Sequence, residues 1–167
     1  MTKKLMMVLI GLMLNTTGLL ANAESTEPVD FALQRLHGDD VSLSEYRGNW
    51  VVLNYWATWC APCRKEMPDL SALNEARDDV IVLGLAYEDT ELENFDEFLE
   101  EFKPSFEILL VDVYAPPEPF GAPKVLPTTI ILDPAGYPIK TYLGPVTRNA
   151  IESFIDGAIT GESLAQP

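Results

Sequence analysis

The sequence predicts an α/β fold in which a central mixed β-sheet is flanked by helices and extended by an N-terminal β-hairpin. Two observations support this prediction. Near-continuous apolar runs at residues 50–55, 80–87 and 128–132 are typical of strands buried on both faces of a sheet. Segments with helical spacing follow the first two runs, and this alternation is typical of a sheet covered by helices.

Residues 1–23 have the pattern of a secretory signal peptide. Two lysines precede an apolar run over 5–14, and Ala21-Asn22-Ala23 resembles a cleavage site. We expect cleavage after this tripeptide, which leaves residues 24–167 as a single domain of ordinary size. The alternative is an uncleaved leader that anchors the protein in the inner membrane, although the apolar run is short for a membrane span.

Charge and compartment limit the partners. The formal net charge of −15 argues against nucleic acid and against an anionic membrane surface. An acidic surface can simply keep the protein soluble, or it can serve a basic protein partner, and the charge alone does not separate these explanations. Export would place the chain in the periplasm, where a dithiol must be kept reduced by a partner or else act as an oxidant.

The domain is expected to begin with the hairpin. Residues 28–36 have the character of a first strand and residues 41–43 of a second, with a turn over 37–40 between them. The single histidine, His37, falls in this turn, where we expect it to be exposed. A further turn over 44–48 leads into the first buried strand.

Both cysteines of the chain, Cys60 and Cys63, stand where the strand over 50–55 is followed by a helix expected over 62–77. A helix N-terminus presents unpaired N–H groups and a partial positive charge, and both favour the nucleophilic thiolate. We expect Cys60 to be partly exposed and to attack a partner's sulfur. Cys63, one helical turn further on, would be the more buried resolving thiol. The C-x-x-C spacing in this setting predicts redox activity.

Two other roles for the cysteine pair have less support. A structural zinc site usually has four ligands, and the chain offers no further cysteine and a single histidine. A purely structural disulfide is possible in an exported protein, but so short a loop constrains the unfolded chain little.

The helix over 62–77 is expected to bury one apolar face. That face is formed by Met67, Leu70 and Leu73. Pro68 lies inside the helix and should kink it, because proline removes a hydrogen bond to the preceding turn. Glu66 is expected to be an exposed helix residue rather than a catalytic one.

After the strand over 80–87, acidic residues surround an apolar stripe over 90–102, which predicts an amphipathic helix. Thr90 and Glu93 have the spacing of a capping box at its start. The remaining elements are expected in the following order: a strand over 106–111, a proline-rich loop over 114–123, a hairpin formed by 128–132 and 137–143, and a helix from the cap Thr147 to 159.

The motifs Trp59-Cys60-Ala61-Pro62-Cys63 and Leu126-Pro127-Thr128-Thr129 resemble those of the thioredoxin superfamily, and most closely those of exported thiol–disulfide oxidoreductases of the TlpA/ResA type. The resemblance covers about residues 28–160. It implies a thioredoxin-like fold, a cis peptide bond before Pro127, and a partner-binding surface. That surface would be formed by Trp59, Ala61, Pro62, Leu126 and Pro127.

The resemblance also bears on proton transfer. Where cytosolic thioredoxins have a buried aspartate, this chain has Asn54, whose amide cannot exchange a proton at neutral pH. Alignment with the TlpA/ResA type assigns the role to Glu88, at the end of a buried strand, as the group that manages the proton of Cys63. The alternative is that Glu88 and Asp89 merely begin the next helix.

The sequence therefore predicts a thiol–disulfide oxidoreductase that reduces protein disulfides outside the cytosol, either as a cytochrome c maturation reductase or as a general one. The resemblance implies a membrane thiol electron donor; no cofactor is required, and a monomer is expected. Alternatives are a thiol oxidase or isomerase, and a copper-binding thioredoxin-like chaperone, because thiolates suit Cu(I). Typical copper carriers of this fold use a wider cysteine spacing with a distant histidine.

Overall fold

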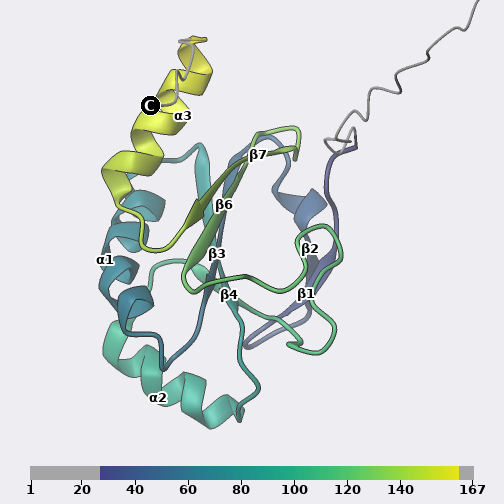
Figure 1. The fold of residues 1–167 in the computed structure, drawn as a ribbon, viewed down its shortest axis with the longest axis vertical. Coiled ribbons are helices and arrows are strands. Elements are labelled where there is room, and N and C mark those ends of the chain that lie inside the picture. The colour runs from purple at the N-terminus through teal and green to yellow at the C-terminus, as the bar shows by residue number, and fades with distance from the viewer. Residues whose placement is uncertain (1–26, 162–167) are drawn as a thin grey trace, which may run out of the picture.

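The computed structural model describes residues 27–161, so the expected signal peptide and the tail beyond Gly161 lie outside the described residues. The described chain forms a seven-stranded sheet with the strand order β2-β1-β5-β4-β3-β6-β7 (Figure 1). The pairs β3–β4 and β4–β5 are parallel, and the other four pairs are antiparallel. The predicted mixed sheet is therefore confirmed, with the parallel strands at its centre.

The strands and helices follow the predicted order. The strands are β1 (Ala32–Arg35), β2 (Asp40–Ser42), β3 (Trp50–Trp56), β4 (Val80–Ala86), β5 (Glu107–Leu110), β6 (Thr128–Leu132) and β7 (Pro138–Leu143). The helices are the short 3₁₀ helix η1 (Leu43–Tyr46), α1 (Ala61–Ala76), α2 (Leu92–Phe102) and α3 (Arg148–Thr160). In this described part of the chain, no helix has the length and apolar character needed to cross a membrane.

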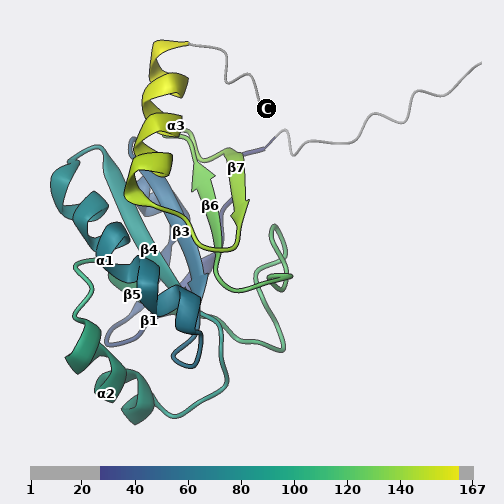
Figure 2. The ribbon, with the colours of Figure 1, turned by 60° about the vertical axis from the view of Figure 1, so that its left-hand side comes forward.

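All three α-helices pack on one face of the sheet. Residues of α1, α2 and α3 share a hydrophobic core with Trp50, Val52 and Trp56 of β3. Figures 1 and 2 show the three helices on the same side of the sheet. The apolar stripes that predicted these helices therefore point to one common core.

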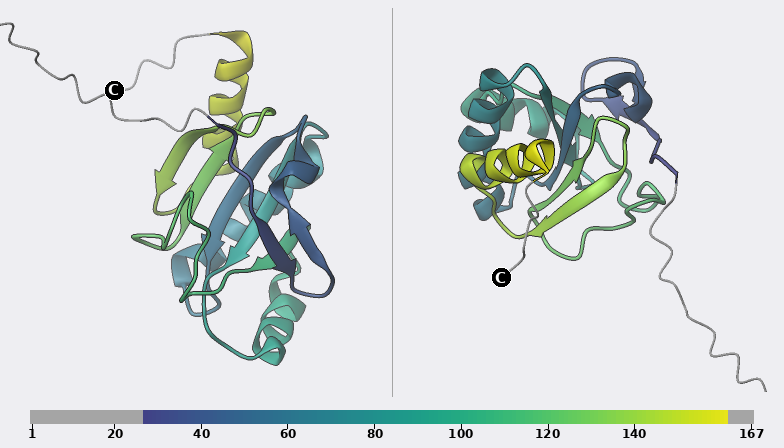
Figure 3. Two further views of the ribbon diagram at one scale, coloured as in Figure 1. Left: turned by 90° about the vertical axis from the view of Figure 1, so that its right-hand side faces the viewer. Right: turned by 90° about the horizontal axis from the view of Figure 1, so that it is seen from above.

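Among residues 27–161, the opposite face of the sheet is covered by segments other than α-helices. Val51, Leu53 and Tyr55 of β3 belong to a second core, to which the N-terminal segment, η1 and Phe120 of the loop before β6 also contribute. Figure 3 shows these segments on the side away from the helices. Every residue of β3 is buried because successive side chains enter two different cores.

The N-terminal hairpin also joins the main sheet. β1 pairs antiparallel with β2 on one side and with β5 on the other. His37 lies in the hairpin turn and is exposed as predicted, and its Nε2 lies 2.7 Å from Oδ1 of Asp96 on α2. The hairpin is thus an edge extension of the sheet that also contacts α2.

Two local predictions were wrong. The segment after β2 forms η1 rather than a simple turn over 44–48. The capping box expected at Thr90 is absent: α2 begins at Leu92, its N-cap is Glu91, and no side chain caps it. The hydroxyl of Thr90 instead accepts a hydrogen bond from the Asn94 side chain at 2.7 Å.

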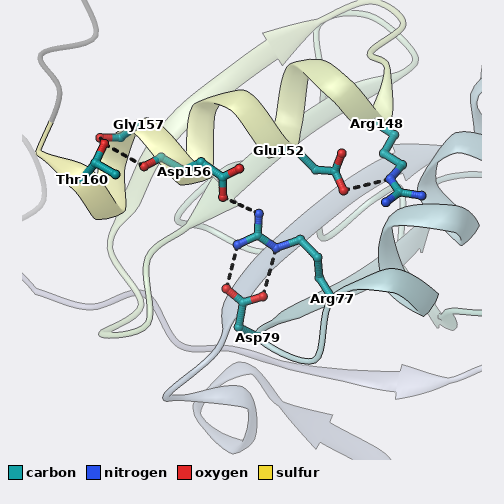
Figure 4. Close-up of polar contacts among 7 residues, drawn as sticks. All are labelled: Arg77, Asp79, Arg148, Glu152, Asp156, Gly157 and Thr160. Atoms are coloured by element: carbon teal, nitrogen blue, oxygen red, sulfur yellow. Dashed lines mark hydrogen bonds and ion pairs between the residues drawn. The ribbon is translucent and has the colours of Figure 1, made fainter.

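The C-terminal helix is held by a cap and by ion pairs. The hydroxyl of Thr147 accepts a hydrogen bond from the Ala150 N–H, which confirms the predicted cap. Arg77, directly after α1, forms an ion pair with Asp156 of α3 at 2.6 Å. Its Nε and Nη2 also donate to the two carboxylate oxygens of Asp79 (Figure 4). These contacts join the end of α1 to α3.

Candidate active site

The two cysteines form a disulfide at the junction between β3 and α1. Their sulfurs are 1.98 Å apart and their Cα atoms 5.3 Å apart. Cys60 is the N-cap of α1, and its Sγ accepts a hydrogen bond from the backbone N–H of Cys63 at 3.3 Å. The predicted strand–helix placement is confirmed. The same N–H, together with the helix dipole, would stabilise a thiolate on Cys60 after reduction.

The sulfurs are less accessible than expected. Cys60 was expected to be partly exposed, but in the disulfide form it is 3% exposed, and Cys63 is fully buried. The exposed surface here belongs to neighbouring residues: Trp59 is 66% exposed, and Ala61 and Pro62 are also exposed. A partner would therefore meet these side chains first.

The segment before β6 lies near the turn that precedes the cysteine pair, because Leu126 and Trp59 line the same cavity. Leu126 packs against the core cluster that contains Cys60 and Cys63, and the Leu126–Pro127 peptide bond is cis, as the resemblance implied. Pro127 is buried, and its carbonyl accepts a hydrogen bond from the Gly144 N–H. The structure thus brings two motifs that are 64 residues apart in sequence to one site.

Glu88 lies just beyond the end of β4 and contacts the turn before Cys60. One carboxylate oxygen accepts from the Thr58 N–H at 2.8 Å and the other from the Thr58 hydroxyl at 3.0 Å. The carbonyl of Thr58 in turn accepts from the Arg64 guanidinium at 3.1 Å. The alternative that Glu88 and Asp89 begin the next helix is wrong, because α2 starts at Leu92. The geometry gives Glu88 the means to hold the turn that carries Trp59.

Glu66 is the functional candidate that the sequence analysis missed. It was expected to be exposed, but it is 3% exposed, and in the described chain it is the one charged residue classed as buried. It lies three residues after Cys63 on α1, so both side chains belong to one helix face. Its spacing to Leu70 and Leu73 was a signal, because these positions continue the same face.

The Glu66 carboxylate is held in a buried polar network. One oxygen accepts from the Asn54 amide nitrogen at 2.7 Å, and the other accepts from the Val146 N–H at 2.8 Å. The same Asn54 nitrogen lies 3.0 Å from the hydroxyl of Thr129, two residues after the cis proline. Burial raises the pKa of Glu66 to about 7, although the hydrogen bonds from Val146 and Asn54 oppose the shift. This carboxyl can therefore release and take up a proton near neutral pH.

The site contains the elements of dithiol chemistry. A helix N-terminus faces the sulfur of Cys60, and a titratable carboxyl lies one turn from Cys63. Leu126, the residue before the cis proline, lines one cavity together with Trp59, the residue before Cys60. Among residues 27–161, no group of three or more His, Cys, Asp or Glu side chains is arranged to hold a metal ion.

The AhpC/TSA family model matches residues 26–143, which is more than half of the chain. The chain belongs to the AhpC/TSA family. Its sheet, its helices and its cysteine pair are those of a thioredoxin-like member, so the predicted fold is confirmed.

Among the proteins similar to this chain, some are named for thiol–disulfide chemistry. The chain is 34% identical to the thiol-disulfide oxidoreductase ResA of Geobacillus thermodenitrificans, over 79% of this chain and 75% of that protein. A solved DsbF homologue from Corynebacterium diphtheriae is 31% identical with a TM-score of 0.68, covering 78% and 85% of the two chains. A secreted thiol-disulfide isomerase from Corynebacterium glutamicum is 28% identical with a TM-score of 0.65, covering 75% and 81%. With its own C-x-x-C disulfide, this family member is a thiol–disulfide oxidoreductase, as predicted.

Proposed function

We propose that this protein reduces disulfides of protein substrates outside the cytosol, with Cys60 and Cys63 as its redox dithiol. The observation that carries the proposal is the position of Cys60 as N-cap of α1, where its sulfur accepts the Cys63 N–H. An N–H donor aimed at a sulfur favours the thiolate, which makes Cys60 the attacking group. Cys63, fully buried behind it, is the resolving group.

The reaction transfers two electrons without a cofactor. In the reduced protein, the Cys60 thiolate attacks one sulfur of the substrate disulfide; a mixed disulfide forms, and the other substrate sulfur leaves as a thiolate. The Cys63 thiolate then attacks Cys60, which releases the second substrate sulfur and forms the Cys60–Cys63 disulfide. The substrate is reduced and the protein oxidised. A membrane thiol donor, by the same exchange in reverse, would return the protein to the dithiol form.

Cys63 must lose its proton to resolve the mixed disulfide. The resemblance assigned this proton to Glu88, but Glu88 contacts Thr58, on the turn before Cys60, and does not lie on the helix that carries Cys63. Glu66 fits the role better because it lies one turn from Cys63 and has a pKa of about 7. We assign Glu66 to proton transfer at Cys63 and Glu88 to positioning of the turn before Cys60.

The partner surface and the compartment complete the proposal. Trp59, Ala61 and Pro62, with the Leu126–Pro127 segment, form the surface that a substrate would contact around the sulfurs. Residues 24–167 would act as a monomeric domain after export to the periplasm. The leader pattern and the relative described as secreted support this location.

The reduction potential of Cys60–Cys63 tests the direction of electron flow. Equilibration of residues 24–167 with glutathione or dithiothreitol buffers should give about −250 mV or lower, on the thioredoxin side of the range. A value near about −120 mV would instead identify an oxidising catalyst. An intermediate value near about −180 mV, together with reshuffling of a scrambled disulfide substrate, would favour the isomerase that one relative's name suggests.

The pH dependence of turnover separates the two glutamates. In Glu66→Gln, resolution of the mixed disulfide should slow, and the rise in rate near pH 7 should disappear. In Glu88→Gln, the rate should fall without a change in the shape of the pH profile. If the profile changed only in Glu88→Gln, the assignment of the proton to Glu66 would be wrong.

A further inference from the structure

A groove of about 1060 Å³ opens beside the turn that leads into the redox disulfide. Thr58 and Trp59, which precede Cys60, form one end of it, and Leu126, which precedes the cis proline, forms another part. Residues 87–90, residues 123–125 and one face of α2 form the rest of the lining. Figure 2 shows α2 and the loop before β6 on either side of the N-terminal end of α1. Because Trp59, the residue before Cys60, lines the groove, a polypeptide bound at Cys60 would lie next to it.

The α2 wall of the groove is acidic. Asn94, Glu97, Phe98 and Glu101 line it, and their spacing places them on one face of the helix. Glu97 and Glu101 are both exposed, lie one turn apart and repel each other. Among residues 27–161, no hydrogen bond or ion pair involves either carboxylate. These two charges are therefore available to a cation from outside the chain.

The other carboxylates of the groove already have partners. Glu88 accepts hydrogen bonds from Thr58, and Asp89 accepts one from the Tyr114 hydroxyl at 3.1 Å. The single basic side chain in the lining is Lys124. The groove therefore carries an excess of negative charge, and its unpaired part is concentrated on α2.

Aromatic side chains border these charges. Trp59, which lines the groove, is 66% exposed, and Tyr114, whose hydroxyl donates to Asp89, is 82% exposed. Phe98 also lines the groove, but its ring is stacked on Trp56 and Phe102. Exposed aromatic faces beside carboxylates suit the long side chains of lysine and arginine, whose stems pack on rings while their charged ends meet carboxylates.

We propose that this groove binds a basic segment of the substrate polypeptide, with lysine or arginine side chains close in sequence to the target cysteine placed against Glu97 and Glu101. The inference rests on the proposed reductase function and adds to it the charge of the preferred substrate. Such a groove would select among disulfides by charge complementarity. Electrostatic attraction would speed the encounter with basic segments, and repulsion would slow the encounter with acidic segments.

The test compares two disulfide peptides that differ only in the residues beside the cysteines, lysine in one and glutamate in the other. The variant Glu97→Gln/Glu101→Gln removes two charges from the groove. The control Glu93→Gln/Glu100→Gln removes two charges from the same helix at exposed positions outside the groove. Circular dichroism establishes that both variants are folded, and kcat/KM is measured for reduction of each peptide by the dithiol form.

The wild-type protein should favour the lysine peptide at low salt, and the preference should shrink as ionic strength rises. Glu97→Gln/Glu101→Gln should lower kcat/KM for the lysine peptide by roughly three- to tenfold, as expected for the loss of two exposed ion pairs. The control should lower it by less than about twofold, because its charges act only at long range.

The outcomes separate the two proposals. If wild type reduces both peptides through Cys60 but without preference, or if the two double variants behave alike, the groove proposal is overturned and the reductase function stands. If neither peptide is reduced in a Cys60-dependent way, the proposed function fails and the groove proposal fails with it.

Discussion

Replacing Glu66 by glutamine removes a buried titrating group while nearly preserving its size. The experiment is best done on the oxidised protein, because disulfide-bonded Cys60 and Cys63 do not titrate. Burial raises the pKa of Glu66 in the folded protein from 4.5 to about 7. The folded state therefore holds this proton more tightly than the unfolded state does.

The sign of the effect follows from this difference. Below about pH 4.5 the carboxyl is protonated in both states and carries no penalty. As the pH rises towards 7, the unfolded chain releases the proton first, so the free energy of unfolding decreases until the folded state has released it too. One pH unit of such a difference corresponds to about 1.4 kcal/mol, so Glu66 should remove about 3 kcal/mol of stability between pH 4.5 and 7.

Glutamine also changes the hydrogen bonds, but this part does not depend on pH. Both Glu66 oxygens accept from N–H groups, of Asn54 and Val146, and glutamine offers a single acceptor oxygen. The Asn54 oxygen has no partner among the described residues, so a flip of this amide would let it accept from the new glutamine nitrogen. The change in hydrogen bonds therefore shifts the free energy of unfolding by the same amount at every pH.

The assay is urea unfolding of wild type and Glu66→Gln at closely spaced pH values from 4 to 8. The difference in unfolding free energy, wild type minus variant, should decrease by about 3 kcal/mol across the interval from pH 4.5 to 7. Glu75→Gln is the control, because it makes the same chemical change at an exposed position of α1, so a pH dependence common to both variants would not come from burial. A flat difference for Glu66→Gln would refute the conclusion that this carboxyl titrates in a buried setting.

Three further predictions concern the disulfide, the sheet and a helix cap. Cys63→Ser should accumulate a mixed disulfide between Cys60 and the substrate, detected by mass spectrometry; the absence of this adduct would contradict the assignment of Cys60 as the attacking group. Gly84→Ala should lower the free energy of unfolding by about 1–3 kcal/mol, because the added methyl would lie 2.7 Å from Ile108 Cδ1; an unchanged urea midpoint would mean that the sheet has room there. Thr147→Ala should cost about 1 kcal/mol by removing the α3 cap, and thermal unfolding that is identical to wild type would show that the cap contributes little.

Much of the fold was readable from the sequence because local patterns determine it. Continuous apolar runs identified β3, β4 and β6, and helical spacing identified α1 and α2. The C-x-x-C pair located the reactive centre, since the change from strand to helix around Cys60 is itself a local pattern. The predicted start of α2 was wrong. The Thr90 hydroxyl accepts a hydrogen bond from the Asn94 side chain instead of capping the helix.

Only the tertiary structure decided how the centre is surrounded. Glu66 is buried because Asn54 of β3 and the Val146 N–H, which is 80 residues away, both donate to it, and the sequence gives no sign of either contact. Glu88 likewise contacts a residue far away in the sequence, Thr58, 30 residues earlier, and not the cysteines. Such a contact cannot be read from local sequence patterns. A side chain's spacing tells which face of an element it occupies, but its burial, and with it its pKa, depends on what the rest of the chain places against that face.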